Sequence, residues 1–504
     1  MMLAWTIYIS FLGALLLLLL PKSNAAAARV LALLAALVTF AITLVFFLQH
    51  RTGEMLTVTD VSWIPSLGIR YHLAADGISL VLLLLTGIIA VTGILFSWNI
   101  EHRANEFFAF YLLLIGSVYG VFLSYDLLLL FVFYEIVIIP KYFLIAIWGS
   151  TRREYGAMKL VLYSFIGSAM VLVGLISAYV VAGAKTMALG DLAGFPFSAH
   201  FQMWAFPLVF VGFAILAGLW PFHTWAPTGH VAAPTAASML LAGVVMKLGA
   251  YGCLRVAMTL FPLGLAPWGF HVLGLGSWRE VFAVLAVIGI VYGAMVALVQ
   301  KDFKFVIGYS SVSHMGFILL GLMTLNQIGL SGAVVQMFSH GILAGLMFAV
   351  VGRMVYDRTH TRELALLGPM DLNKAIPFAA ATFVVAGMAS MGLPGFSGFV
   401  AELMIVIGVW HAFPILTVLV GLGLVVGVAY IWRAMQKAFF AEADRASAAP
   451  HEPLPPITLP ERLGAIVLIV ASVIVGLYPQ VLLNIIVPAL NSPLFNGLRQ
   501  GGWR

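Results

Sequence analysis

Five ionisable side chains stand inside long apolar segments of the 504-residue sequence. Glu135, Lys247 and Glu402 are surrounded by apolar residues, and His314 and His340 each follow a serine in two further apolar segments. A charge at the centre of a bilayer costs about 2.5–3.5 kcal/mol on insertion scales, so it is rarely without a role. Carboxyl groups, a desolvated amine and imidazoles can all take up and release protons. The five residues therefore predict a polar axis that carries protons through a bundle of membrane helices.

Each of these residues also has a structural interpretation. Glu135 could be the fixed partner of a nearby lysine, Lys247 the counter-ion of a buried carboxylate, and Glu402 a charge at a helix end. Either histidine could be a hydrogen-bonded packing residue. Lys141 and Lys159 stand near predicted helix ends, where long side chains reach the interface, and are expected to be structural or to lie where protons enter.

The sequence lacks the motifs of other chemistries. It has no glycine-rich dinucleotide motif after a strand and no P-loop. Its one cysteine, Cys253, excludes an intrachain disulfide and the usual iron–sulfur or zinc sites. His223 and His230 are seven residues apart across a proline, which argues against a metal pair. We therefore expect no metal and no cofactor in this chain.

The composition indicates which elements position these groups. Hydrophobic residues make up 63% of the chain and charged residues 9%, where a soluble domain has about 25% charged residues. This excludes a soluble globular protein, a disordered chain and a nucleic-acid binder. A membrane-spanning helix needs about 20 mainly apolar residues. Fourteen segments qualify, which predicts an all-α polytopic membrane protein: 3–20, 27–48, 79–98, 107–125, 127–147, 160–182, 204–225, 236–260, 280–299, 305–323, 330–352, 377–411, 414–436 and 464–483.

Two of these segments are interrupted by proline. The seventh is broken at Pro221 and the twelfth at Pro394, and the freed carbonyls persist in a bilayer only where protein or water satisfies them. Because the breaks are five helices apart, they predict two repeats, helices 4–8 and 9–13, with an ion route between the broken pieces. Two unrelated kinks are the alternative. The predicted parts are helices 1–3 (1–105), the first repeat (106–260), the second repeat (279–438) and a loop with helix 14 and the tail (439–504).

The basic residues predict the orientation of the chain in the membrane. If the N-terminus is outside, fifteen Lys and Arg residues fall in inner loops and six in outer loops and the tail. Cytoplasmic loops carry the excess of basic residues, so both termini are expected on the outer side. The polar stretch from Ala441 to Arg462 then forms an inner-side loop.

Several motifs are similar to those of antiporter-like membrane subunits. Over about residues 70–480 the sequence most resembles subunit M of respiratory complex I, which is chain 4 in mitochondria. The Thr-His-Thr-Arg loop and a Glu, in place of a Lys, in helix 12 favour subunit M over its sister subunits and the Mrp antiporters. The motifs are Pro221–Ser238, Tyr309–Gly316, Gln336–Gly341, Arg358–Arg362, Asp76–Ser79, Gly392–Gly395 and the Leu-Pro-Glu-Arg that ends at Arg462.

The resemblance implies two inverted five-helix repeats and a proton-translocating subunit of NADH:quinone oxidoreductase in a bacterial inner membrane. NADH, FMN, iron–sulfur clusters and quinone would belong to partner subunits. The implied partners are the other membrane-arm subunits, especially the L-type and N-type antiporter-like ones, and lipids. Glu135, Lys247 and Glu402 match the family's proton-carrying residues of helices 5, 8 and 12, and His314 and His340 match histidines between them.

Three positions depart from the family pattern. Aligned on Pro-Phe-His, the helix-7 lysine that pairs with the helix-5 glutamate falls at Leu216. Thr228 replaces an aspartate, and Ala232 replaces an acidic or amide residue. Glu135 thus lacks its expected cationic partner.

Two outcomes follow for Glu135. In the first, His223 or another group replaces the lysine, since His223 lies seven residues after Leu216 and close to the same helix face. In the second, the chain is a structural subunit that does not pump. An Mrp-type cation/proton antiporter subunit is a further alternative, and Na⁺ in place of H⁺ stays open. Lys159 and His230 are weaker candidates for the pathway.

Overall fold

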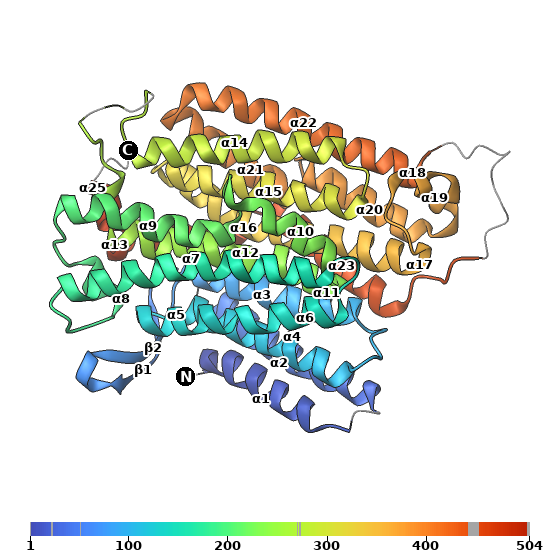
Figure 1. Ribbon diagram of the computed structural model, residues 1–504, viewed down its shortest axis with the longest axis horizontal. Helices are drawn as coiled ribbons and strands as arrows, with labels where there is room; N and C mark the ends of the chain where they lie inside the picture. The colour runs from blue at the N-terminus through green and yellow to red at the C-terminus, as the bar shows by residue number, and fades with distance from the viewer. Residues whose placement is uncertain are drawn as a thin grey trace.

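The computed structural model describes residues 2–21, 24–50, 52–269, 271, 274–441 and 453–500. Its long helices lie side by side along one direction (Figure 1). Within these residues, thirteen helices are long and apolar enough to cross a membrane, and the predicted twelfth segment is formed by two shorter apolar helices. The all-α polytopic fold with about fourteen spans is therefore confirmed. Residues 442–452 of the predicted inner-side loop lie outside the described residues.

The helices follow one another in chain order, and many of the predicted spans consist of more than one helix. The N-terminal part contains α1 (Trp5–Leu19), α2 (Ala25–Gln49) and α3 (Gly77–Phe96). The next part contains α4 (Ala104–Leu123), α5 (Leu127–Ile136), α6 (Ile138–Trp148), α7 (Arg153–Val181), α8 (Leu189–Ala193), α9 (Ala199–Ala217), α10 (Trp225–Ala232), α11 (Thr235–Leu240), α12 (Met246–Gly252) and α13 (Met258–Leu260).

The second half has a similar succession of long and short helices. It contains α14 (Trp278–Val299), α15 (Phe303–Met323), α16 (Gln327–Phe348), α17 (Asp357–Thr359), α18 (Leu364–Leu367), α19 (Leu372–Ala375), α20 (Pro377–Ser390), α21 (Ser397–Ala412) and α22 (Pro414–Phe439). The C-terminal part contains α23 (Leu459–Leu477), α24 (Gln480–Leu490) and α25 (Asn496–Gln500). The inverted relation of the two repeats and their boundaries stay predictions.

The two helix breaks have the same local structure. α9 and α20 are both followed by a glycine with a positive φ, +83° at Gly218 and +76° at Gly392. The leucine after each glycine donates its N–H to the carbonyl five residues earlier, at 2.9 and 3.1 Å. This Schellman arrangement ends a helix, and glycine adopts it without steric strain. The glycines end the helices before Pro221 and Pro394 are reached, so proline is not what ends them.

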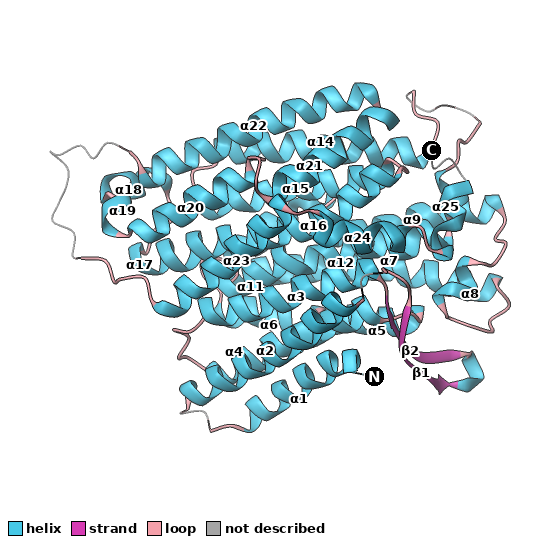
Figure 2. Ribbon diagram, turned by 180° about the vertical axis from the view of Figure 1, so that it is seen from behind, coloured by secondary structure: helices cyan, strands magenta, loops and turns pink. Residues whose placement is uncertain are grey.

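A β-hairpin lies between α2 and α3, in a segment for which the sequence analysis predicts no membrane span. Strand β1 (Leu56–Ile64) pairs antiparallel with β2 (Ile69–Ala75). Arg70 and Asp60 face each other across the strands at 2.7 Å. The hairpin stands at the end of the bundle where the chain begins and finishes (Figure 2). The two termini thus lie at one end, as the loop charges predict, and the membrane face at this end stays a prediction.

Two buried ion-pair clusters connect segments that are far apart in the sequence. Near the hairpin, Asp76 caps α3 and accepts from Arg255 at 2.5 Å, and the side chains are 1% and 2% exposed. At the opposite end, Glu461 forms an ion pair with Arg353 at 2.5 Å and accepts a hydrogen bond from Arg358 at 2.7 Å. The Asp-Gly-Ile-Ser motif thus supplies Asp76 to the ion pair at one end of the bundle. The Arg358–Arg362 motif supplies Arg358 to the ion pair at the other end.

We expect Asp76→Ala to destabilise the protein strongly. The substitution leaves the Arg255 guanidinium buried without a counter-charge, a loss of about 3–5 kcal/mol. The midpoint of thermal unfolding in detergent measures the effect. Asp60→Ala is the matched control, because its partly exposed pair with Arg70 is worth about 0–1 kcal/mol. Equal midpoints for the two variants would contradict the role of the buried pair.

Candidate functional site

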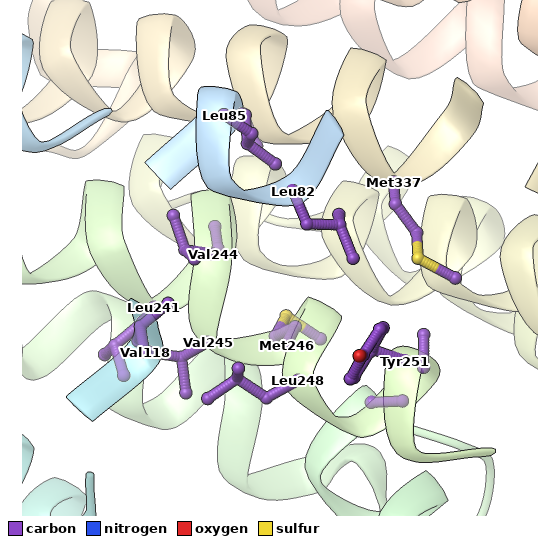
Figure 3. Close-up of a cluster of buried hydrophobic side chains, with 14 of the residues drawn as sticks. Leu82, Leu85, Val118, Leu241, Val244, Val245, Met246, Leu248, Tyr251 and Met337 are labelled. Atoms are coloured by element: carbon purple, nitrogen blue, oxygen red, sulfur yellow. The ribbon is translucent and has the colours of Figure 1, made fainter. Parts of the chain in front are cut away.

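Lys247 lies at the centre of the bundle. It sits on α12, directly after the π-helical segment Leu241–Val245, and its side chain is fully buried. Leu82 of α3, Val118 of α4 and Met337 of α16 are among the apolar side chains around this helix (Figure 3). The ammonium group donates to the carbonyl oxygen of Ala242, inside the π-helical segment, and its Nζ lies 2.8 Å from Nδ1 of His340. Since π-helical segments often occur at functional sites, the irregular helix supports a role for this lysine.

Close packing of two helices brings His340 to Lys247. His340 lies on α16, and the next residue, Gly341, faces the backbone of Gly243. A Cβ atom at position 341 would lie 2.7 Å from the Gly243 carbonyl oxygen, too close for any side chain. Glycine at 341 therefore lets α16 approach the π-helical segment closely enough for a direct contact between the two polar side chains.

His314 continues the polar chain on the far side of His340. The two imidazole rings are stacked, with centroids 5.3 Å apart and planes within 8°. Nε2 of His314 lies 3.4 Å from Oε1 of Glu402 and 3.4 Å from the carbonyl oxygen of Ser390. Nδ1 lies 2.8 Å from the carbonyl oxygen of Ser310. Both ring nitrogens thus face acceptors, an arrangement that suits a doubly protonated imidazolium next to a carboxylate.

A small internal cavity borders both histidines. Its volume is about 10 Å³, close to the space that one water molecule needs. Three polar atoms of residues that line it have no protein partner within the described chain: Ser311 Oγ, Gln336 Oε1 and His340 Nε2. A buried water typically makes about three hydrogen bonds. The cavity can therefore hold one water that hydrogen-bonds to His340 where the two rings do not bond directly.

Glu135 lies in a different part of the bundle. It is partly buried near the end of α5, where Pro140 cannot donate to the carbonyl of Ile136 and the helix is interrupted at Val137. The Ser168 side chain lies next to its carboxylate. In the part of the chain that the structure describes, no contact joins Glu135 to Lys247. The structure therefore brings together four of the five predicted residues and places the fifth apart.

Lys141 is the cation whose charge acts on the Glu135 carboxylate. The charges of these two residues act on each other, and Nζ of Lys141 donates to Ser164 Oγ at 2.9 Å. The expectation that the Lys141 side chain reaches the interface is wrong, because the residue lies in the first turn of α6, within the span Leu127–Trp148, and is 1% exposed. Lys159 is partly exposed in the second turn of α7, as predicted.

His223 does not reach Glu135. It follows the helix-7 break, where its ring packs at 5.2 Å from Tyr292 and 6.4 Å from Tyr309. The charge that acts on it is that of Lys159. Since α9 ends at Ala217, the helix face shared by Leu216 and His223 in the sequence is not continuous. His223 therefore does not occupy the place of the missing helix-7 lysine.

His230 lies between two lysines. It is fully buried, its ring stacks on Phe348 at 4.8 Å, and the charges of Lys247 and Lys304 act on it. Lys304 donates to the Ala233 carbonyl at 2.8 Å and is 2% exposed. A cavity of about 320 Å³ is lined by Lys304 and by residues at the end of the bundle opposite the termini.

Sequence reasoning missed the polar residues that complete the site. The serines directly before the two histidines point elsewhere, since Ser313 donates to the Ile290 carbonyl and Ser339 contacts Ser397. Ser310, one helical turn before His314, contacts it instead. The spacing of four residues is a signal that could have found Ser310, because residues i and i+4 share a helix face.

We expect one ordered water in the cavity beside His340. A cryo-electron microscopy map that resolves waters should show it within hydrogen-bonding distance of His340 Nε2, Ser311 Oγ and Gln336 Oε1. Gln336→Leu should remove it, and the control Ser313→Ala, outside the cavity, should leave it in place. An unchanged water in Gln336→Leu would contradict this assignment.

Comparison with known proteins agrees with the fold. Residues 124–427 match the model of the family described as NADH:quinone oxidoreductase/Mrp antiporter, TM. The chain is 35% identical over 476 residues to NADH-quinone oxidoreductase subunit M of Rhodobacter capsulatus, covering 92% of this chain and 90% of that protein. A chain of respiratory complex I from Thermus thermophilus with bound NADH superposes with a TM-score of 0.87 at 27% identity, over 99% of this chain and 100% of that chain.

The Mrp branch shares the same architecture. A chain of the Mrp complex from Dietzia sp. DQ12-45-1b superposes with a TM-score of 0.82 at 22% identity, over 97% of this chain and 96% of that chain. That likeness shows the fold alone. The matched family model and the length and identity of the subunit M alignment decide the assignment: this chain belongs to the NADH:quinone oxidoreductase/Mrp antiporter family of membrane subunits and resembles subunit M of complex I.

Proposed function

We propose that this chain is a proton-translocating membrane subunit of an NADH:quinone oxidoreductase. The observation that carries the proposal is the succession of contacts from Lys247 through His340 and His314 to Glu402. Four titratable groups inside an apolar bundle are costly to bury and are rarely retained without a role. The subunit M relatives, which match almost the whole chain, support the same assignment.

Each of these four residues has an atom that can hold a proton or pass it on. The Lys247 ammonium donates toward Nδ1 of His340, which leaves Nε2 of His340 to carry a proton at the cavity. A water in this cavity would connect the ring with its neighbours. His314 can then pass a proton from Nε2 to the Glu402 carboxylate, 3.4 Å away. Redox chemistry would take place in partner subunits that hold NADH, FMN, iron–sulfur clusters and quinone.

The surroundings of the chain follow from the same assignment. Large apolar residues cover the outer face of α22, among them Ile415, Val418 and Val425 at 68–82% exposure. Such a face suits lipid or a neighbouring membrane subunit. We propose that the neighbours are the other antiporter-like subunits of the L and N types, in a bacterial inner membrane with both termini on the outer side.

One observation favours a second candidate function. No ionisable residue stands between Phe206 and Pro221, and Leu216 occupies the position of the expected lysine. A subunit without this lysine could be a structural member of the membrane arm that does not pump. Counting protons separates the two functions.

We expect Lys247→Met and Glu402→Gln each to lower the number of protons translocated per NADH oxidised. Each variant removes one proton-carrying group from the chain of contacts. The measurement uses the whole complex, purified with its flavin and iron–sulfur proteins and reconstituted into liposomes. Lys374→Met is the control, because Lys374 is an exposed residue paired with Asp371.

A wild-type proton ratio in the assembled Lys247→Met complex would contradict pumping by this chain and favour the structural function. Co-purification without any flavin or iron–sulfur protein, together with Na⁺-dependent proton exchange, would identify an Mrp-type antiporter subunit instead.

A further inference from the structure

Lys141 is buried in the middle of a membrane span and has no role in the chain of contacts described above. Its side chain is 1% exposed, and its Nζ donates to Ser164 Oγ at 2.9 Å. An ammonium group has three hydrogens to donate, and burying it without a counter-charge is costly. A nearby anion would therefore stabilise it in this position.

Glu135 is that anion. Its carboxylate and the Lys141 ammonium act on each other electrostatically, and Oε1 of Glu135 is buried without a hydrogen-bond partner in the described chain. Ser168 lies next to the carboxylate, and Ser164 binds the ammonium group. Since Ser164 and Ser168 are four residues apart on α7, their hydroxyl groups share one helix face. Two hydroxyl groups thus line the space between the acid and the amine.

Helix packing places Leu216 at the same polar face of α7. α7 and α9 pack antiparallel, with Gly174 against Val209 and Gly167 against Gly212, where a Cβ at 167 would lie 2.5 Å from the Gly212 carbonyl. One turn further along α9, this register puts Leu216 opposite Ser164.

An aromatic contact brings α5 to this part of α9 as well. The rings of Tyr134, next to Glu135, and Phe213 are 5.4 Å apart. A lysine at position 216 would therefore extend toward the hydroxyl group that Lys141 contacts.

We propose that Lys141 is the buried cation that works with Glu135 during proton translocation, in the place of the lysine missing at position 216. The inference rests on the proposed function. When Glu135 is ionised, the ammonium group of Lys141 balances its charge. When Glu135 takes up a proton, Lys141 loses its counter-charge and is favoured to release a proton along the Ser164–Ser168 face. The pair then returns to its first state once Glu135 passes its proton to Lys141.

The test removes the positive charge at position 141, or moves it to position 216, and measures protons per NADH in the reconstituted complex. Lys141→Gln keeps a donor toward Ser164 and loses the charge, so protons per NADH should fall to the value of Glu135→Gln. The double variant Lys141→Gln/Glu135→Gln should show no further loss. Lys141→Arg keeps the charge, but a guanidinium group does not give up its proton, so this variant should lose translocation as Lys141→Gln does. Lys141→Met combined with Leu216→Lys should retain at least half of the translocation that Lys141→Gln loses. Lys374→Met again serves as the control.

A purely structural role for Lys141 predicts different results. In that case Lys141→Gln assembles and pumps at the wild-type ratio, or Leu216→Lys restores none of the loss, and either result overturns the proposal. Lys247→Met separates this failure from that of the proposed function. If Lys247→Met lowers the ratio and Lys141→Gln does not, only the role of Lys141 is lost. If neither variant lowers it, the proposed function fails as well.

Discussion

A buried amine that must find acceptors inside an apolar bundle is the constraint on which the centre of this structure depends. Lys247 meets it with a carbonyl of its own irregular helix and an imidazole nitrogen of α16. The π-helical segment presents the carbonyl, and Gly341 gives the imidazole access. A regular α-helix would keep that carbonyl in its own hydrogen-bond ladder. The irregular backbone and the close helix contact are therefore parts of one solution to the burial of a charge.

The two broken helices have the same backbone structure at the break but different surroundings. Both breaks free carbonyl groups that a bilayer cannot satisfy. In helix 7 the carbonyl oxygen of Ile215 accepts a hydrogen bond from the indole N–H of Trp225 at 2.8 Å. An indole is a donor only, so this partner does not exchange protons. In helix 12 the carbonyl of Ser390 faces His314, a group that can exchange its proton. The same Gly-Leu sequence thus ends both helices, and the partner of the freed carbonyl decides whether the break contributes to a polar path.

Hydropathy predicts the spans well, because an apolar run of about 20 residues in a bilayer must satisfy its own backbone hydrogen bonds and therefore forms a helix. The hairpin was missed because polar residues interrupt both strands, and a search for apolar runs of about 20 residues passes over such segments. Lys247 and Glu402 were found because charges are rare in apolar segments. The burial of Lys141 was missed, because the sequence places the residue in the predicted span 127–147 but does not show which way its side chain points. The structure buries it in the first turn of α6. The failure of His223 to replace the lysine also could not be read from spacing, because Gly218 ends the helix between the two positions.

The parallel stack of His314 and His340 has a consequence for proton transfer. The rings touch face to face at 5.3 Å and share no direct hydrogen bond, so transfer between them needs a bridging molecule in a space of about 10 Å³. A void this small has room for about one water. The link between the two rings therefore depends on a single molecule, whereas the neighbouring contacts, Lys247 with His340 and His314 with Glu402, join protein atoms directly.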